Sequence, residues 1–170
     1  MIQQSMENAE KLIPKIDKEY ADRFGFRHGG LLEPYRCEDS DLILITAGTM
    51  ATEAKIAVDK LRNEGVKVGS ARIRVLRPFP KEDVRRLVRS AQMVAVIDRG
   101  VSFGMEGFMC EEIKASVYGE EDCPPIAGFI AGLGGRDVTF QTIERVARMA
   151  AGWLQKGKAQ EKPVWVDLKE

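Results

Sequence analysis

Leu42-Ile43-Leu44-Ile45-Thr46, followed by Ala47-Gly48-Thr49, is the stretch that decides the fold of this chain. Residues 42–46 form a short apolar run of the kind found in strands that are covered on both faces. Gly48 ends the run, and the residues after Thr49 carry apolar side chains at helical spacing. The stretch therefore predicts a strand, a tight turn and a helix in immediate succession.

The same succession repeats along the chain. The first helix should end at Gly65, because glycine adopts the left-handed conformation that terminates helices. A second strand lies within residues 66–76, and since Arg72 and Arg74 alternate with apolar residues there, we expect it to have one polar face and to be less buried. The remaining predicted elements are a helix around residues 84–91, a strand at 93–97, a helix to about residue 118, a strand at 126–131, a helix around 143–150 and a further strand within 164–168, at an edge of the sheet.

Strands that alternate with helices at this spacing predict right-handed β–α–β units. We therefore expect a three-layer α/β fold, in which helices cover both faces of an open, mainly parallel sheet. Ligands and partners of such sheets gather at the carboxyl ends of the strands. Four turns should converge there: residues 48–49, 77–80, 98–107 and 132–137.

The segments outside this core set the expected domain boundaries. Residues 1–20 carry apolar side chains at helical spacing among charges and predict an amphipathic helix that packs on a neighbour. Glycines and a proline between residues 24 and 40 indicate an extended arm. We therefore assign residues 1–40 to a helix and arm, residues 41–154 to the α/β domain, and residues 155–170 to a linker with an edge strand.

Composition narrows the classes of partner. The chain of 170 residues has 26 basic and 26 acidic residues, so no basic excess favours binding to nucleic acid. No apolar run approaches the length that crosses a bilayer, and the first residues do not begin a signal peptide. These features predict a soluble cytoplasmic protein with no membrane partner.

The cysteines and the single histidine offer little catalytic chemistry. Cys37, Cys110 and Cys123 lie far apart, so they cannot assemble an iron–sulfur cluster or a zinc site, and we expect buried or inert thiols. His28 is interpreted as a loop or interface histidine. No nucleophile has a plausible base, so no catalytic residue is assigned.

Two glycine-bearing turns are candidates for anion binding. Gly48 and Thr49 precede a helix whose free N–H groups, with the Thr49 hydroxyl, suit a phosphate, although an ordinary helix cap is the favoured interpretation. The turn Gly132-Leu133-Gly134-Gly135-Arg136-Asp137 allows close backbone approach, and Arg136 suits a phosphate or carboxylate. A reversal of direction, with Asp137 or Thr139 capping the next helix, is the simpler interpretation of this second turn.

A third turn completes this set of candidates. Asp98 and Arg99 end one strand, while Arg136 and Asp137 follow another on the same edge of the sheet. Crossed ion pairs between the two turns are therefore an option, and they would be structural rather than catalytic. The residues around Gly104 and Gly107 lack the dinucleotide-binding fingerprint, which disfavours a Rossmann cofactor.

Four motifs, taken in order, are similar to a known family. The chain resembles the C-terminal part of the alpha subunit of pyruvate:ferredoxin oxidoreductase and related 2-oxoacid:ferredoxin oxidoreductases, over roughly residues 24–152. The motifs are Tyr35-Arg36-Cys37-Glu38-Asp39-Ser40-Asp41, Arg77-Pro78-Phe79-Pro80, Asp98-Arg99-Gly100-Val101-Ser102-Phe103-Gly104 and Gly132-Leu133-Gly134-Gly135-Arg136-Asp137.

The resemblance implies a fold like the C-terminal domain of transketolase and a non-catalytic docking role. The full complex of that family decarboxylates a 2-oxoacid, by default pyruvate, on thiamine diphosphate with magnesium, passes electrons through iron–sulfur clusters to ferredoxin, and delivers the acyl group to coenzyme A. None of these cofactors is expected on this chain, which should be inactive alone. Its partners would be the other domains or subunits, and ferredoxin indirectly. The turn residues expected at the interface are Arg99, Ser102, Gly104, Gly107, Gly134, Gly135, Arg136 and Asp137.

Two departures from the family pattern accompany the resemblance. A large domain normally precedes this region, so residues 1–20 are interpreted as the connection to it, in a fragment or a split subunit. Gly100 stands where asparagine is expected. The competing hypothesis is a stand-alone α/β module that binds coenzyme A or another phosphate-bearing ligand through Gly48, Thr49 and Arg136.

Overall fold

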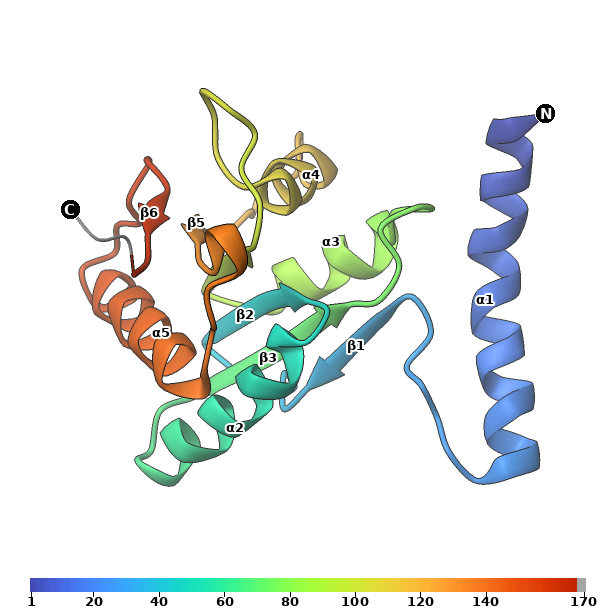
Figure 1. The fold of residues 1–170 in the computed structure, drawn as a ribbon, viewed down its shortest axis with the longest axis horizontal. Coiled ribbons are helices and arrows are strands. Elements are labelled where there is room, and N and C mark those ends of the chain that lie inside the picture. The colour runs from blue at the N-terminus through green and yellow to red at the C-terminus, as the bar shows by residue number, and fades with distance from the viewer. Residues whose placement is uncertain (168–170) are drawn as a thin grey trace.

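A computed structural model describes residues 1–167 of the chain, and Figure 1 shows its course. The elements in chain order are α1 (Ile2–Phe24), β1 (Leu32–Tyr35), β2 (Leu42–Ala47), α2 (Met50–Asn63), β3 (Val68–Ile73), α3 (Lys81–Arg89), β4 (Met93–Asp98), α4 (Phe108–Ser116), β5 (Ile126–Ile130), a 3-10 turn η1 (Leu133–Gly135), α5 (Phe140–Gln155) and β6 (Val164–Trp165).

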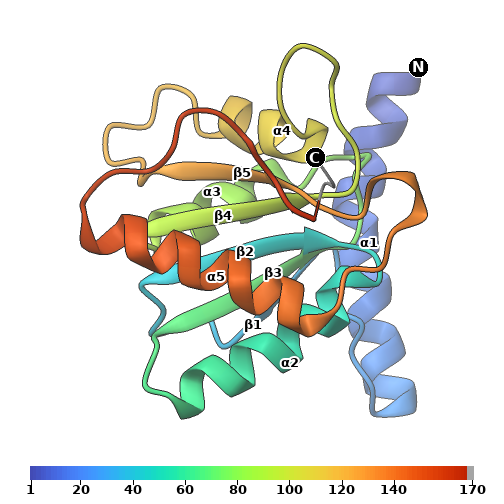
Figure 2. The ribbon, with the colours of Figure 1, turned by 60° about the vertical axis from the view of Figure 1, so that its left-hand side comes forward.

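One sheet of six strands in the order β1-β3-β2-β4-β5-β6 forms the centre of this fold. The strands from β2 to β6 run parallel to their neighbours, with Leu42 opposite both Val68 and Met93, and only β1 runs antiparallel. Helices α2 and α5 cover one face of the sheet, and α3 and α4 cover the other (Figure 2). The predicted three-layer α/β fold with a mainly parallel sheet is confirmed.

The strand that begins at Leu42 forms the middle of this arrangement. Its side chains alternate between the two faces, so that Leu42 and Leu44 pack beneath α2 and α5 while Ile43 and Ile45 pack beneath α3. All four are essentially inaccessible to solvent. The unbroken apolar run is therefore explained by burial on both faces, as the sequence predicted, and α2 ends just before Gly65, which has a φ of 86°.

Two predictions about the first half of the sheet are corrected. The expected arm contributes Leu32–Tyr35 as β1, paired with β3, so the sheet begins at Leu32 rather than near Asp41. The second strand is not less buried: Arg72 alone of its residues is partly exposed. The reason is the strand order, which places β3 between β1 and β2, and the strand ends at Ile73 before Arg74.

The two ends of the chain lie outside the central layers. Helix α1 stands beside the domain, and none of its residues is buried (Figure 1). At the other end, Val164 and Trp165 form the edge strand β6, whereas the rest of the predicted strand includes Leu168, which lies outside the described residues. Among the helices of residues 1–167, none has the length and apolar character that spanning a membrane requires.

Candidate interface at the carboxyl ends of the strands

The four turns named from the sequence lie at one edge of the sheet. They follow β2, β3, β4 and β5, and because these strands are parallel, their carboxyl ends point the same way. The turn after β4, residues 99–107, projects beyond the layers in both ribbon views (Figures 1 and 2). We refer to residues 99–107 as the β4–α4 loop.

Asp98 fixes the base of the β4–α4 loop. Its side chain is 1% exposed, and its two carboxylate oxygens accept the N–H groups of Met109 and Cys110, each at 3.0 Å. Gly107 occupies the N-cap position of α4 and has no side chain to offer, so the carboxylate from β4 satisfies the free N–H groups of the helix. Burial raises the pKa of Asp98 to about 6, despite these two hydrogen bonds.

Gly107 is required by this packing. A Cβ on Gly107 would overlap the Asp98 side chain, so only glycine allows the carboxylate to reach the helix. A Cβ on Gly100, where the family resemblance suggested asparagine, would lie 3.1 Å from the ring of Phe108, and this exposed ring would have to shift slightly to admit it.

Hydrogen bonds within the β4–α4 loop give it a defined shape. The N–H of Ser102 donates to the carbonyl of Glu106 at 2.8 Å, and the N–H of Met105 donates to the carbonyl of Ser102 at 2.9 Å. Gly104 has a φ of 84° at the tip of the turn. Glu106 is buried, and both of its carboxylate oxygens accept from the Lys114 ammonium at 2.8 Å, which ties the end of the loop to α4.

The tip of the loop carries apolar side chains that point away from the chain. Phe103 is 96% exposed and Met105 is 66% exposed, and Phe108 at the start of α4 is also exposed. From the sequence, Ser102, Gly104 and Gly107 of this turn were assigned to the interface, but Phe103 and Met105 were not. Their position between Gly100 and Gly107, outside any periodic pattern, was the available signal.

The glycine turn after β5 lies beside the β4–α4 loop. The N–H of Ala131 donates to the carbonyl of Asp98 at 2.9 Å. Gly132 has a φ of 77°, and a Cβ there would lie 2.7 Å from Val138 Cγ2 and 3.0 Å from Arg99 Nε. The Arg99 side chain therefore lies against the glycine turn, where Gly134 and Gly135 are exposed and also have positive φ.

Arg136 does not join the two turns. Its guanidinium donates to the carbonyl of Asp167 at 2.7 Å, so it holds the segment after β6 instead. The crossed ion pairs considered from the sequence are not formed, because Asp98 is occupied by the backbone of α4. Arg99 and Asp137 are exposed, and neither forms an ion pair with residues 1–167.

The proposed anion site at Gly48 and Thr49 has mixed features. Both residues are exposed, Gly48 has a φ of 62°, and Thr49 occupies the N-cap position of α2 without a side-chain cap bond. Nearby in sequence, the buried Thr46 Oγ1 has no hydrogen-bond partner among residues 1–167. The third candidate contact, Arg136, follows β5, whereas Gly48 and Thr49 follow β2. Because β4 lies between these two strands, the candidate contacts do not follow neighbouring strands.

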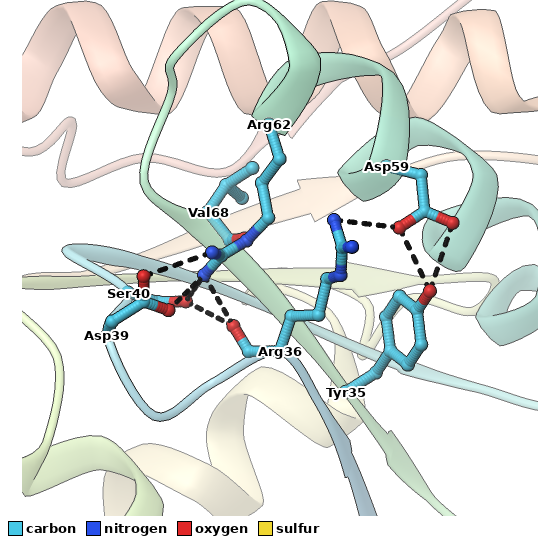
Figure 3. Close-up of polar contacts among 7 residues, drawn as sticks. All are labelled: Tyr35, Arg36, Asp39, Ser40, Asp59, Arg62 and Val68. Carbon is cyan, nitrogen blue, oxygen red and sulfur yellow. Dashed lines mark hydrogen bonds and ion pairs between the residues drawn. The ribbon is translucent and has the colours of Figure 1, made fainter.

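The opposite edge of the sheet holds a polar network around Arg62, shown in Figure 3. The Arg62 guanidinium donates to the carbonyls of Val68 and Arg36, to Ser40 Oγ and to the Asp39 carboxylate, at 2.6 to 3.1 Å. These contacts join the end of α2 to the loop between β1 and β2. The first motif of the family resemblance therefore has a structural role.

Tyr35 and Asp59 extend the same network (Figure 3). The Tyr35 hydroxyl lies 2.9 Å from both carboxylate oxygens of Asp59, and Arg36 forms an ion pair with Asp59 at 3.1 Å. Arg36 has a φ of 53°, which turns its carbonyl toward Arg62. We call the set Tyr35, Arg36, Asp39, Ser40, Asp59, Arg62 and Val68 the Arg62 network.

The thiols and the single histidine contact groups of the chain itself. Cys37 is buried and donates to the carbonyl of Ser70 at 3.2 Å, and burial raises its pKa to about 11. Burial also raises the pKa of Cys110, whereas Cys123 is exposed. The ring of His28 packs against the rings of Tyr20 and Phe26. Over residues 1–167, no group of three His, Cys, Asp or Glu side chains could hold a metal ion.

Comparison with protein-family models gives a match over most of the domain. Residues 40–143 match the model described as "Pyruvate:ferredoxin oxidoreductase core domain II". The chain is 39% identical to pyruvate synthase subunit PorA of Pyrococcus abyssi over all of its length, and 37% identical to ketoisovalerate oxidoreductase subunit VorA of Pyrococcus horikoshii over 99% of it. It spans 43% of the length of each of these two relatives.

Solved structures support the fold. A split-gene transketolase, described as an inactive beta4 tetramer, aligns with 68% of this chain and 39% of its own at a TM-score of 0.54 and 17% identity. A 2-oxoglutarate:ferredoxin oxidoreductase from Magnetococcus marinus, with 2-oxoglutarate, coenzyme A and succinyl-CoA bound, aligns with 78% of this chain and 21% of its own at a TM-score of 0.53 and 22% identity.

The sequence match and the fold agree with each other. The matched segment runs from Ser40 through Ile143 and includes β2 to β5 and all four turns in full. This chain belongs to the pyruvate:ferredoxin oxidoreductase core domain II family.

Proposed function

We propose that this chain is a non-catalytic docking domain of a cytoplasmic 2-oxoacid:ferredoxin oxidoreductase, with pyruvate as the substrate of the full complex. The observation that carries the proposal is the alignment of the whole chain with 43% of a pyruvate synthase subunit. In the proposed complex, thiamine diphosphate, magnesium and iron–sulfur clusters are held by other domains or subunits, which also act on coenzyme A and ferredoxin.

The internal division of the chain is part of the same proposal. Residues 41–154 would be the docking domain, residues 1–40 its connection to a neighbouring domain, and residues 155–170 a linker ending in an edge strand. The pairing of β1 with β3 supports a firm attachment of the connection. The exposed residues of the carboxyl-end turns, with the half-buried Ser102, would then meet another part of the complex, whereas Gly107 is buried and would not: the exposed ones are Arg99, Gly104, Gly134, Gly135, Arg136 and Asp137.

Reconstitution tests the proposal. The chain is produced with the remaining oxidoreductase subunits from the same organism and purified through an affinity tag on one of those subunits. We expect it to co-purify in stoichiometric amount and to be required for pyruvate-dependent reduction of ferredoxin, while the chain alone shows no turnover. A chain that remains free of every such subunit contradicts the docking role.

A stand-alone module that binds coenzyme A is the alternative. The unpartnered hydroxyl of buried Thr46, close in sequence to the start of α2, is the observation in its favour. The contact between Arg136 and Asp167 speaks against it, because it occupies one of the three proposed ligands. Calorimetry with coenzyme A decides the matter: saturable heat that Arg136→Ala weakens would support the module, and no heat at high ligand concentration would eliminate it.

A further inference from the structure

The β4–α4 loop combines two features that surface loops seldom share, namely strongly exposed apolar side chains and a rigid base. Phe103 at 96% and Met105 at 66% exposure are among the most exposed large apolar residues of the chain. Apolar side chains that become shielded from water when a partner binds supply most of the binding energy at protein interfaces. The apolar side chains at the tip are therefore expected to be buried by a binding partner.

The base of the loop keeps this tip in place before any partner binds. Asp98 ties its start to α4, and Glu106 ties its end to Lys114. Two backbone hydrogen bonds inside the loop fix the turn between these anchors. Because little conformational freedom remains to be lost, a partner can bind the tip with a small entropic cost.

The charged groups around the tip of the loop indicate which charges a complementary partner surface carries. The exposed charged groups of the β4–α4 loop and the glycine turn are Arg99, Arg136 and Asp137, because Asp98 and Glu106 are buried. Two guanidinium groups therefore stand against one carboxylate. Within residues 1–167, Arg99 forms no ion pair and Arg136 bonds only a carbonyl. A complementary surface carries carboxylates at its rim.

We propose that the β4–α4 loop inserts Phe103 and Met105 into an apolar pocket with a carboxylate rim on another domain or subunit of the oxidoreductase. This inference rests on the proposed function, and it specifies which surface docks and what chemistry receives it. Arg99, which lies against Gly132, faces the acidic rim. A second copy of this chain is a poor occupant, since two basic tips would repel each other.

Photocrosslinking in the reconstituted complex tests where the tip goes. A photoreactive phenylalanine replaces Phe103 in the full chain, and a control replaces Tyr118, which is 88% exposed and lies just after α4, at the end of that helix away from the loop. We expect position 103, and not position 118, to crosslink to a segment of an oxidoreductase subunit that contains apolar residues and at least one Asp or Glu. Crosslinks only to a second copy of this chain, or none in an assembled complex, would overturn the inference.

Substitutions test the energetics of the same contact. Phe103→Asp and Arg99→Glu should each weaken association with the other subunits about tenfold or more, and the wild-type association should weaken with added salt. Tyr118→Asp and Lys158→Glu on exposed positions outside the loop are the matched controls and should change it less than about twofold. Unfolding by urea should be the same for all four variants, since none of these side chains is buried.

The outcomes separate the inference from the proposed function. If the wild-type chain binds no oxidoreductase subunit, the docking role itself fails. If the complex assembles and Phe103→Asp and Arg99→Glu bind within about twofold of the wild type, the docking role stands and the inference about the loop is wrong.

Discussion

The two edges of the central sheet use similar polar groups for opposite purposes. At the amino edge, where the parallel strands β2 and β3 begin, the Arg62 guanidinium and the Asp59 carboxylate bond to groups of the chain itself. These bonds hold the loop between β1 and β2 against α2. At the carboxyl edge, the Asp98 carboxylate binds the start of α4, and the loop that it anchors turns Phe103 outward. The polar groups of the amino edge are hydrogen-bonded within the chain, whereas the β4–α4 loop at the carboxyl edge is rigid at its base and has exposed apolar side chains at its tip.

This difference separates residues that stabilise the fold from residues that recognise a partner. The family resemblance does not distinguish the two edges, because the motif at residues 35–41 lies at one edge and the motif at residues 98–104 at the other. Only the contacts of each motif show whether it stabilises the fold or is free to meet a partner. Changes in the Arg62 network should therefore lower stability without a direct effect on docking, and changes at the loop tip should do the reverse.

The largest effect on stability is expected where the carboxyl edge is packed most closely. Gly107→Ala places a Cβ into the Asp98 side chain, so it should lower the free energy of unfolding by about 3 kcal/mol and displace the β4–α4 loop. Urea unfolding measures the change. Gly152→Ala in α5 is the matched control, since its Cβ would meet nothing within 4 Å and should be neutral or stabilising. Equal stability of Gly107→Ala and the wild type would contradict the account of this edge.

Arg62→Met tests the amino edge. The substitution keeps an apolar stem but removes the hydrogen bonds to Val68, Arg36 and Ser40, so we expect a loss of about 2 kcal/mol. Chemical denaturation provides the measurement, with exposed Arg23→Met as the control that should change little. Association of folded Arg62→Met with the other subunits should remain unchanged. Weakened association of the folded variant would mean that the amino edge also docks.

The raised pKa of Asp98 predicts a pH dependence of stability at the carboxyl edge. Burial raises the pKa of Asp98 to about 6, against about 4 in an unfolded chain, so the folded state binds this proton more tightly. The group therefore adds stability as the pH falls through 6, fully so below about 4, and this stability is lost as the pH rises again.

Asp98→Asn isolates this contribution from that of other carboxyl groups, such as Asp39, whose pKa is lowered by Arg62 and which acts in the opposite direction. Between about pH 7 and about pH 5, the wild type should gain roughly 1.5 kcal/mol relative to Asp98→Asn. Urea unfolding across this range measures the difference. A difference that is independent of pH would show that Asp98 does not titrate as described.

Tyr35→Phe should have the smallest effect. It removes only the hydroxyl bond to Asp59 and should lower the free energy of unfolding by about 1 kcal/mol. The same bond raises the pKa of Tyr35, so ultraviolet titration should show one tyrosine that ionises later than the others and is absent in the variant. Tyr118→Phe, at a strongly exposed position, is the control. If no tyrosine of the wild type ionises at a higher pH than the others, the hydrogen bond between Tyr35 and Asp59 does not form as described.

The sequence predicted the elements whose pattern is local. The run from Leu42 to Thr46 marked a strand buried on both faces, and Gly65 marked the end of a helix, because each signal lies within a few residues. Strand β1 was missed for the opposite reason. Leu32–Tyr35 is short and contains Pro34, and it becomes a strand only through pairing with Ser70 to Ile73, far along the chain.

The candidate site was predictable in outline but not in its contacts. Parallel strands placed the turns at one edge, and the glycines at 104 and 107 were visible in the sequence. The capping of α4 by Asp98 spans 11 residues, and the bond from Arg136 to Asp167 spans 31, so neither has a local signature. Phe103 was missed because an apolar residue in a loop is indistinguishable, in sequence, from one that folds back into the core.

Hydrogen–deuterium exchange of the chain, alone and in the reconstituted oxidoreductase, tests the contrast between the two edges most directly. The account predicts that assembly protects amides of residues 99–108 in the β4–α4 loop and at the start of α4, while amides of residues 35–40 and 59–62 in the Arg62 network exchange at the same rate in both states. Protection confined to residues 35–40 and 59–62, with residues 99–108 unchanged, would contradict it.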